Sequence, residues 1–162
     1  MNSIVVNIQE QTLTLLDDES NSLAVYPIST SKYGVGCENG SEKTPLGLHR
    51  IKDMIGGAMP INEVFINRMP HGSLDECIER GVDLPDDVIT SRIMWLEGMQ
   101  PGMNKGSYVD TYQRYIYIHG TSEENKIGQP ASIGCIRMLN KDIVELYRKV
   151  ESGCEVNIIE KA

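Results

Sequence analysis

Short apolar runs separated by polar turns dominate the pattern along this chain. Three runs near the N-terminus are rich in β-branched residues and predict strands at 4–8 (IVVNI), 12–16 (TLTLL) and 23–28 (LAVYPI). Comparable runs predict further strands at 48–54, 62–67, 92–96, 115–118 and 155–159. We therefore expect a mainly β fold of seven or eight strands.

Two segments carry the signals of helices. The segment Ser73-Leu74-Asp75-Glu76 matches a capping box and predicts a short helix that stops at Gly81. Asn140 is expected to cap a second helix that runs to about Glu151. The helical spacing of its apolar residues predicts one buried face, formed by Ile143, Leu146, Tyr147 and Val150. With no linker or repeat in the sequence, residues 1–162 are expected to form a single domain.

Charge and hydropathy narrow the classes of partner. The formal net charge is −8, whereas nucleic acids and anionic membrane surfaces attract basic proteins, so neither is expected as a partner. No segment approaches the ~18 apolar residues of a membrane span. No Lys or Arg precedes Lys32, so the basic region of a signal peptide is missing. With Met1 as the natural start we expect a cytoplasmic protein, and a periplasmic one if a leader has been removed.

Four cysteines are present, and their spacing forms neither a CxxC pair nor a zinc motif. We therefore expect free thiols, no metal site and no cofactor. Cys37, Cys77 and Cys154 have no histidine partner in sequence and are expected to be structural.

The candidate chemistry lies between residues 112 and 142. His119 follows directly on the predicted strand 115–118, and Cys135 comes sixteen residues later on a turn that contains Gly134. A neighbouring imidazolium can lower the pKa of a thiol by several units, which would give a nucleophile and a proton carrier for acyl transfer. The alternative is a buried core histidine and a buried apolar cysteine, and spacing alone favours it.

The motifs around these two residues resemble those of the L,D-transpeptidase catalytic domain (YkuD-type) family. The matching residues are His119-Gly120 and, within the run 132–138, Ser132, Gly134, Cys135, Ile136, Arg137 and Met138. A weaker match is Thr44-Pro45-Leu46-Gly47, and the resemblance covers roughly residues 3–159. It implies the L,D-transpeptidase catalytic fold, with mixed β-sheets in a sandwich- or barrel-like core and two short helices.

The same resemblance implies roles for individual residues. Cys135 would be the nucleophile and His119 the general base and acid, while backbone amides around Gly134 and Cys135 would hold the oxyanion.

Further residues of the motif would bind substrate or shape the site, namely Gly120, Ser132 and Arg137. Arg137 would anchor a substrate carboxylate or fix the loop. Ile133 departs from the family pattern, in which many members carry His or Arg at this place.

A murein tetrapeptide or other muropeptide is the implied substrate. Attack of Cys135 on the third residue's carbonyl would release the terminal D-Ala and leave a thioester. Water as acceptor gives an L,D-carboxypeptidase, and an amine of another stem gives a cross-link. The expected cytoplasmic location favours a carboxypeptidase in murein recycling. The alternatives are an L,D-transpeptidase that cross-links peptidoglycan and a non-catalytic module that binds muropeptides.

Overall fold

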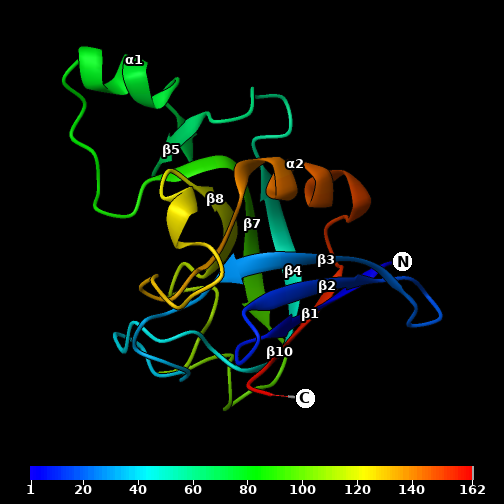
Figure 1. Ribbon diagram of the computed structural model, residues 1–162. Coiled ribbons are helices and arrows are strands. Elements are labelled where there is room, and N and C mark those ends of the chain that lie inside the picture. Colours follow the sequence, from blue (N-terminus) through cyan, green and yellow to red (C-terminus); the bar gives the residue numbers. More distant parts are fainter. Residues whose placement is uncertain (162) are drawn as a thin grey trace.

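The computed structural model describes residues 1–161, and its main feature is one mixed sheet of ten strands (Figure 1). The strands are β1 (Ser3–Asn7), β2 (Thr12–Leu16), β3 (Ser22–Ser29), β4 (Gly47–Ile55), β5 (Val64–Ile66), β6 (Met69–Pro70), β7 (Ile89–Gly98), β8 (Tyr117–Thr121), β9 (Ile136–Met138) and β10 (Glu155–Ile159). The expected mainly β class is therefore confirmed, and each predicted strand overlaps an observed one. The two strands that the prediction missed, β6 and β9, are only two and three residues long.

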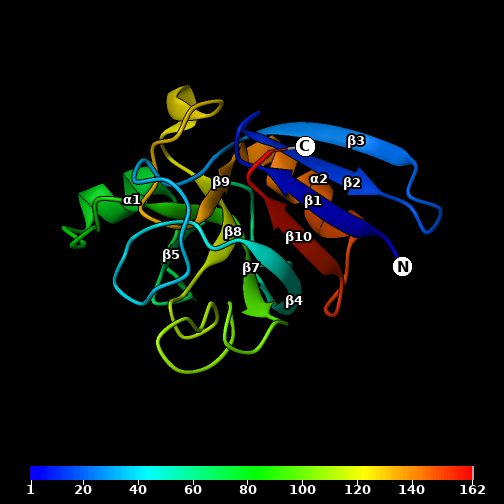
Figure 2. The same ribbon diagram turned by 90° about the horizontal axis from the view of Figure 1, so that it is seen from below.

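Most of the sheet closes into a ring. Its strand order is β4-β10-β1-β2-β3-β9-β8-β7, and β4 also pairs with β7, which joins the two ends. Figure 2 shows β1, β10 and β4 side by side. Most pairs are antiparallel, but β1 pairs with β10, and β8 with β9, in parallel. The second parallel pair positions the candidate site.

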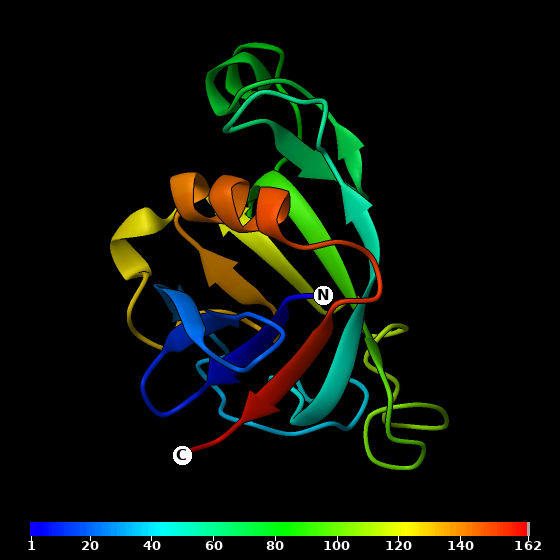
Figure 3. The same cartoon turned by 90° about the vertical axis from the view of Figure 1, so that its right-hand side faces the viewer.

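The ring encloses the main hydrophobic core. Side chains alternate between the two faces of a strand, so one face of β1 and β2 contributes Ile4, Val6, Leu13 and Leu15, each at most 1% exposed. The helix α2 (Asn140–Lys149) packs across β7 and β8 and adds Ile143 and Leu146 to the same core (Figure 3). Complete burial of each such side chain stabilises the fold by about 1.5–3 kcal/mol.

A smaller unit projects from the ring, where α1 (Leu74–Glu79), β5 and β6 form an extension (Figure 1). Ser73 and Glu76 make both hydrogen bonds of the predicted capping box. A second apolar cluster, centred on Val64, Cys77 and Val88, holds the extension together. A single helical turn (Glu124–Lys126) lies between β8 and β9. Within residues 1–161, no helix is long and apolar enough to cross a membrane.

Two sequence predictions were wrong in detail. The strand predicted at 115–118 begins at Tyr117 and continues to Thr121, because Tyr115 adopts φ = +58°, which breaks an extended chain. His119 therefore lies within β8 rather than after a strand.

Asn140 does not cap α2, and Leu139 stands at the cap position without a side-chain hydrogen bond. The Asn140 side chain accepts hydrogen bonds from the hydroxyls of Thr90 and Ser91 and donates one to the carbonyl of Thr121. These tertiary partners replace the local cap. The helix ends at Lys149, slightly before the predicted end.

Candidate active site

The parallel pairing of β8 and β9 brings together residues that lie far apart in sequence. Ile118 pairs with Ile136 and His119 with Arg137, so Cys135 enters β9 beside Tyr117. The backbone N–H of Tyr117 donates to Sγ of Cys135 over 3.3 Å. The two halves of the motif thus meet at one edge of the ring.

The loop before β9 is held by the hydroxyls of Ser132 and Thr44, which are not proposed reacting groups. The Ser132 hydroxyl donates to the carbonyl of Cys135 over 2.7 Å and accepts the N–H of Gly134 over 3.2 Å. Thr44 donates to the carbonyl of Gly134 over 2.9 Å, and Gly134 itself adopts φ = +135°, a conformation that favours glycine. Ser132 and Thr44 therefore fix the backbone on which the thiol stands.

This arrangement alters the expected oxyanion donors. The Gly134 N–H is already bonded to Ser132, so it does not point freely into a site. The N–H of Cys135 donates to no acceptor among residues 1–161. The amide of Cys135, rather than that of Gly134, is available to a developing negative charge.

His119 is completely buried, and its tautomer follows from its neighbours. Nδ1 lies 2.6 Å from the carbonyl oxygen of Gly120, which can only accept, so Nδ1 carries the proton of the neutral ring. Nε2 has no hydrogen-bond partner among the described residues and lies 4.0 Å from Oδ2 of Asp87. Burial lowers the pKa of His119, an effect that the Asp87 carboxylate opposes. The ring is therefore neutral near pH 7 and presents a basic nitrogen.

Cys135 and His119 line the same cavity, which has a volume of about 370 Å³. Within residues 1–161 no hydrogen bond joins them, since the half-buried thiol donates to the carbonyl of Tyr115 over 3.4 Å. Burial raises the pKa of the Cys135 thiol to about 12, although the Tyr117 N–H lowers it in part. His119 is a neutral ring in this structure, so it does not supply the imidazolium that was expected to lower this pKa. A neutral thiol and a neutral imidazole can still carry acyl transfer if the proton moves as sulfur attacks.

Arg137 is only 1% exposed, and its guanidinium is engaged within the protein. It donates to Glu123 over 3.2 Å and to the carbonyl of Ala131 over 3.3 Å, and it lies 3.7 Å from Oδ1 of Asp87. Of the two expected roles, these contacts fit the fixing of loops. Asp87 was missed from the sequence because it lies in the aperiodic segment 80–88, whose position is set by tertiary packing.

Gly120 lies outside the cavity, whereas Ile133 lines it. Gly120 is buried behind His119, where a Cβ would stand 2.5 Å from the carbonyl oxygen of Thr90. Its smallness permits close packing of β8 on β7, and it does not line the cavity. Ile133 is 51% exposed and lines the cavity beside the thiol, so it offers an apolar wall to a ligand.

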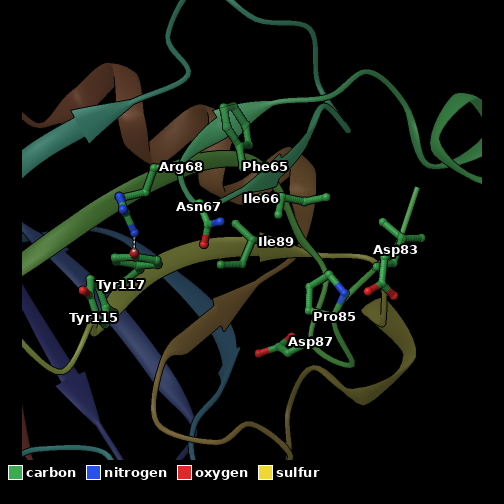
Figure 4. A pocket seen from close by; sticks show the side chains of 11 residues that line it. Phe65, Ile66, Asn67, Arg68, Asp83, Pro85, Asp87, Ile89, Tyr115 and Tyr117 are labelled. Carbon is green, nitrogen blue, oxygen red and sulfur yellow. Dashed lines mark hydrogen bonds between the residues drawn. The ribbon is translucent and has the colours of Figure 1, made fainter.

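A larger lobe of about 560 Å³ adjoins the cavity and shares Pro85, Asp87, Ile89, Tyr115 and Tyr117 with it (Figure 4). Arg68 stands at one end of this lobe, and Asp83 and Asp87 stand at the other. The site is therefore a cleft whose larger lobe carries opposite charges at its two ends. Arg68 and Asp83 were not predicted from the sequence as residues of the site.

The other three cysteines do not line the cavity that holds Cys135. Cys77 and Cys154 are buried and Cys37 is half-buried, all as free thiols. In the part of the chain that the structure describes, no three His, Cys, Asp or Glu side chains converge as a metal site would require.

Comparison with known proteins agrees with this architecture. The family model of the YkuD L,D-transpeptidase catalytic domain matches residues 1–158. The protein named "Probable L,D-transpeptidase YcfS" of Escherichia coli (strain K12) is 29% identical over 159 residues, which are 96% of this chain and 43% of that protein.

Solved structures show the same fold at low sequence identity. An L,D-transpeptidase from Xylanimonas cellulosilytica superposes with a TM-score of 0.60 at 14% identity, over 98% of this chain and 60% of that one. L,D-transpeptidase 3 from Mycobacterium tuberculosis, in complex with a faropenem-derived adduct, gives a TM-score of 0.59 at 16% identity, over the same shares. The chain thus spans less than half of the curated relative and less than two thirds of these structures. With a family match over nearly its whole length, this chain belongs to the YkuD-type L,D-transpeptidase catalytic domain family.

Proposed function

We propose that this protein is a cysteine-dependent acyltransferase that acts on the L,D bond of murein stem peptides and releases the terminal D-Ala of tetrapeptides. The observation that carries the proposal is the cavity shared by Cys135 and His119, where the thiol is half-buried and Nε2 of the imidazole has no hydrogen-bond partner among the described residues. Membership of the family supports the choice of substrate.

In the first step, Sγ of Cys135 attacks the carbonyl carbon of the third residue. The thiol proton passes to Nε2 of His119, and the carbonyl oxygen becomes an oxyanion that the free N–H of Cys135 can bind. The C–N bond then breaks, and the leaving D-Ala amine takes the proton from His119. A thioester on Cys135 remains, and the Nδ1–H bond to Gly120 holds the ring in place throughout.

The second step decides the reaction class, and we propose water as the acceptor. Cys135 is half-buried rather than enclosed, so solvent reaches the position of the thioester. His119 would take a proton from the attacking water and return one to sulfur, which gives an L,D-carboxypeptidase. This activity fits a role in murein recycling in the cytoplasm, where soluble wall fragments are reused.

A second candidate is cross-linking of peptidoglycan by the same acyl-enzyme. Asp83, Asp86 and Asp87 lie along the cleft and would attract the protonated form of an amine acceptor. This function fits the periplasm, because the polymer to be cross-linked lies outside the membrane.

Incubation with a soluble murein tetrapeptide, followed by mass spectrometry, tests the proposal. We expect the tripeptide and free D-Ala, and an acyl adduct on the intact protein that is absent from Cys135→Ala. Addition of excess tripeptide then separates the two acceptors. Cross-linked dimer as the main product would establish the transpeptidase, and binding without turnover would leave a muropeptide-binding module.

A further inference from the structure

The larger lobe of the cleft contains a guanidinium that has no anionic partner within residues 1–161. Arg68 lines one end of the lobe, and its Nη1 points to the hydroxyl of Tyr117 (Figure 4). We propose that Arg68 is a specificity-determining residue that binds a carboxylate of the peptide attacked by Cys135. The inference rests on the proposed function, whose substrate it defines more closely.

The backbone fixes the point from which this side chain starts. Asn67 and Arg68 form a two-residue turn between β5 and β6, with Ile66 paired to Met69. Both turn residues have positive φ, +50° at Asn67 and +65° at Arg68. Such values match the tight turns that connect two antiparallel strands, but they cost a residue with a side chain roughly 1–2 kcal/mol. Arg68 is therefore held in one place instead of sampling a flexible loop.

An aromatic surface fixes the guanidinium itself. Its central carbon lies 5.0 Å from the ring centre of Trp95 and 5.4 Å from that of Tyr115. Trp95 in turn stacks on Tyr112 with ring centres 4.2 Å apart. These rings attract the cation through their electron-rich faces and limit its motion. The charge is thus held in position by aromatic rings, without a carboxylate from the described part of the chain.

Most of the donors of Arg68 remain available. A guanidinium has five N–H groups, and only one of them finds an acceptor among the described residues, the Tyr117 hydroxyl at 3.1 Å. Among residues 1–161 no carboxylate oxygen lies within 4.0 Å of its nitrogens. A planar fork with spare parallel donors is the group that best fits a carboxylate.

Tyr117 connects this group to the nucleophile. Its hydroxyl accepts from Arg68, while its backbone N–H donates to Sγ of Cys135 over 3.3 Å. A peptide whose carbonyl meets the sulfur therefore lies within the length of one tyrosine from the guanidinium.

Two other guanidinium groups near the thiol already bind acceptors within the protein. Arg137 pairs with Glu123 and Asp87, and Arg114 donates to the carbonyls of Gly36 and Lys43. At the far end of the lobe, Asp83 and Asp87 would repel a carboxylate. The charges of the cleft thus direct a carboxylate of the ligand to the Arg68 end.

The carboxylate could be the C-terminus of the tetrapeptide or a side-chain carboxylate of its third residue. Binding is measured by calorimetry on full-length Cys135→Ala, which cannot turn the peptide over, with three ligands. These are the free tetrapeptide, its C-terminal amide and a peptide amidated at the third side chain. Each ligand is tested against the Cys135→Ala protein with its native Arg68 and against the same protein with Arg68→Met. A third protein carries Arg68→Lys, which keeps the positive charge and loses the planar pair of parallel N–H donors. Arg148→Met, at an exposed position of α2, is the control for loss of one positive charge.

We expect Arg68→Met to weaken binding of the free peptide by roughly 10- to 100-fold, the range of a hydrogen-bonded charge. Arg68→Lys should fall between the two, and Arg148→Met should bind as well as the parent. The amide that removes the recognised carboxylate should bind equally to Arg68 and Arg68→Met, which identifies the source. Tyr117→Phe removes the hydroxyl that orients the guanidinium of Arg68. This variant should therefore show a smaller preference for the acid over the amide.

Unchanged binding in Arg68→Met, or an equal loss for all three ligands, would overturn the assignment of Arg68. If the enzyme with Cys135 still converts the tetrapeptide, the proposed function stands while the subsite fails. If the tetrapeptide is neither bound nor converted, both are overturned.

Discussion

Oδ2 of Asp87 lies 4.0 Å from Nε2 of His119, on the side of the ring opposite its hydrogen bond to Gly120. The second oxygen of the carboxylate is buried without a hydrogen-bond partner among the described residues, 3.7 Å from Nη1 of Arg137. Asp87 therefore lies between His119, the base that must accept a proton, and Arg137, whose positive charge stabilises the Asp87 carboxylate. An imidazolium formed during attack would be stabilised by this carboxylate.

Asp87→Asn should slow turnover of the tetrapeptide roughly tenfold, because the imidazole becomes a weaker base without the nearby negative charge. The loss of the carboxylate lowers the pKa of His119 further, so the acidic limb of the profile of kcat/KM against pH should move to lower pH. The measurement is kcat/KM from pH 4 to 8. Asp86→Asn is the matched control, since Asp86 lines the same cavity and forms no ion pair with His119 within the described chain. A profile that does not move would show that Asp87 has no effect on the base.

Removal of either proposed reacting group should abolish most of the activity. Cys135→Ala and Cys135→Ser should show no acyl adduct, since alanine has no nucleophile and a serine hydroxyl is far less acidic than a thiol. His119→Gln should slow acylation by about 10²-fold or more, the usual effect of a positioned acid–base group. Rapid quench with tetrapeptide and intact-protein mass spectrometry measures the acylation rate. Near-normal acylation in any of these variants would assign the chemistry to other residues.

The resting thiol should react slowly with a small alkylating agent. Because burial raises the pKa of Cys135 to about 12, the rate of modification by iodoacetamide should still be rising above pH 9. The half-buried Cys37 is a competing target, so the measurement uses Cys37→Ser and peptide mapping by mass. A rate that levels off below pH 8 would instead indicate a thiolate paired with an imidazolium.

The features that the sequence predicted well depend on neighbours in the chain. Alternating apolar residues placed β1 and β2, and the Ser73–Glu76 capping box placed α1. The motif around Cys135 located the site because its Ser and Gly shape a local loop.

The features that it missed depend on contacts between distant segments. Asp87 reaches His119 from a loop 32 positions earlier, and Asn140 bonds to Thr90 across the fold instead of capping its helix. Arg68 lies in a turn with a left-handed backbone, and the turn contains no glycine that would have indicated this conformation in the sequence. The depth of burial that sets the pKa of Cys135 likewise follows only from the assembled cleft.

A buried histidine outside the site should make stability depend on pH. His49 is fully buried, where its ring contacts the carbonyl of Gly47 and the hydroxyl of Thr111, and burial lowers its pKa from 6.5 to about 4. Below pH 6.5, His49 becomes protonated in the unfolded chain but stays neutral in the folded protein. The free energy of unfolding therefore decreases as the pH falls toward 4. The loss from this group is on the order of 3 kcal/mol, a large part of the stability of a typical domain.

Urea unfolding followed by the fluorescence of Trp95, at intervals from pH 4 to 7.5, measures this dependence. His49→Gln can keep polar contacts with Gly47 and Thr111 while removing the titrating group, so the decrease toward low pH should become shallower. Part of the slope should remain, because burial also lowers the pKa of His119 and acts with the same sign. Equal slopes in His49→Gln and the parent protein would show that His49 takes up its proton without unfolding.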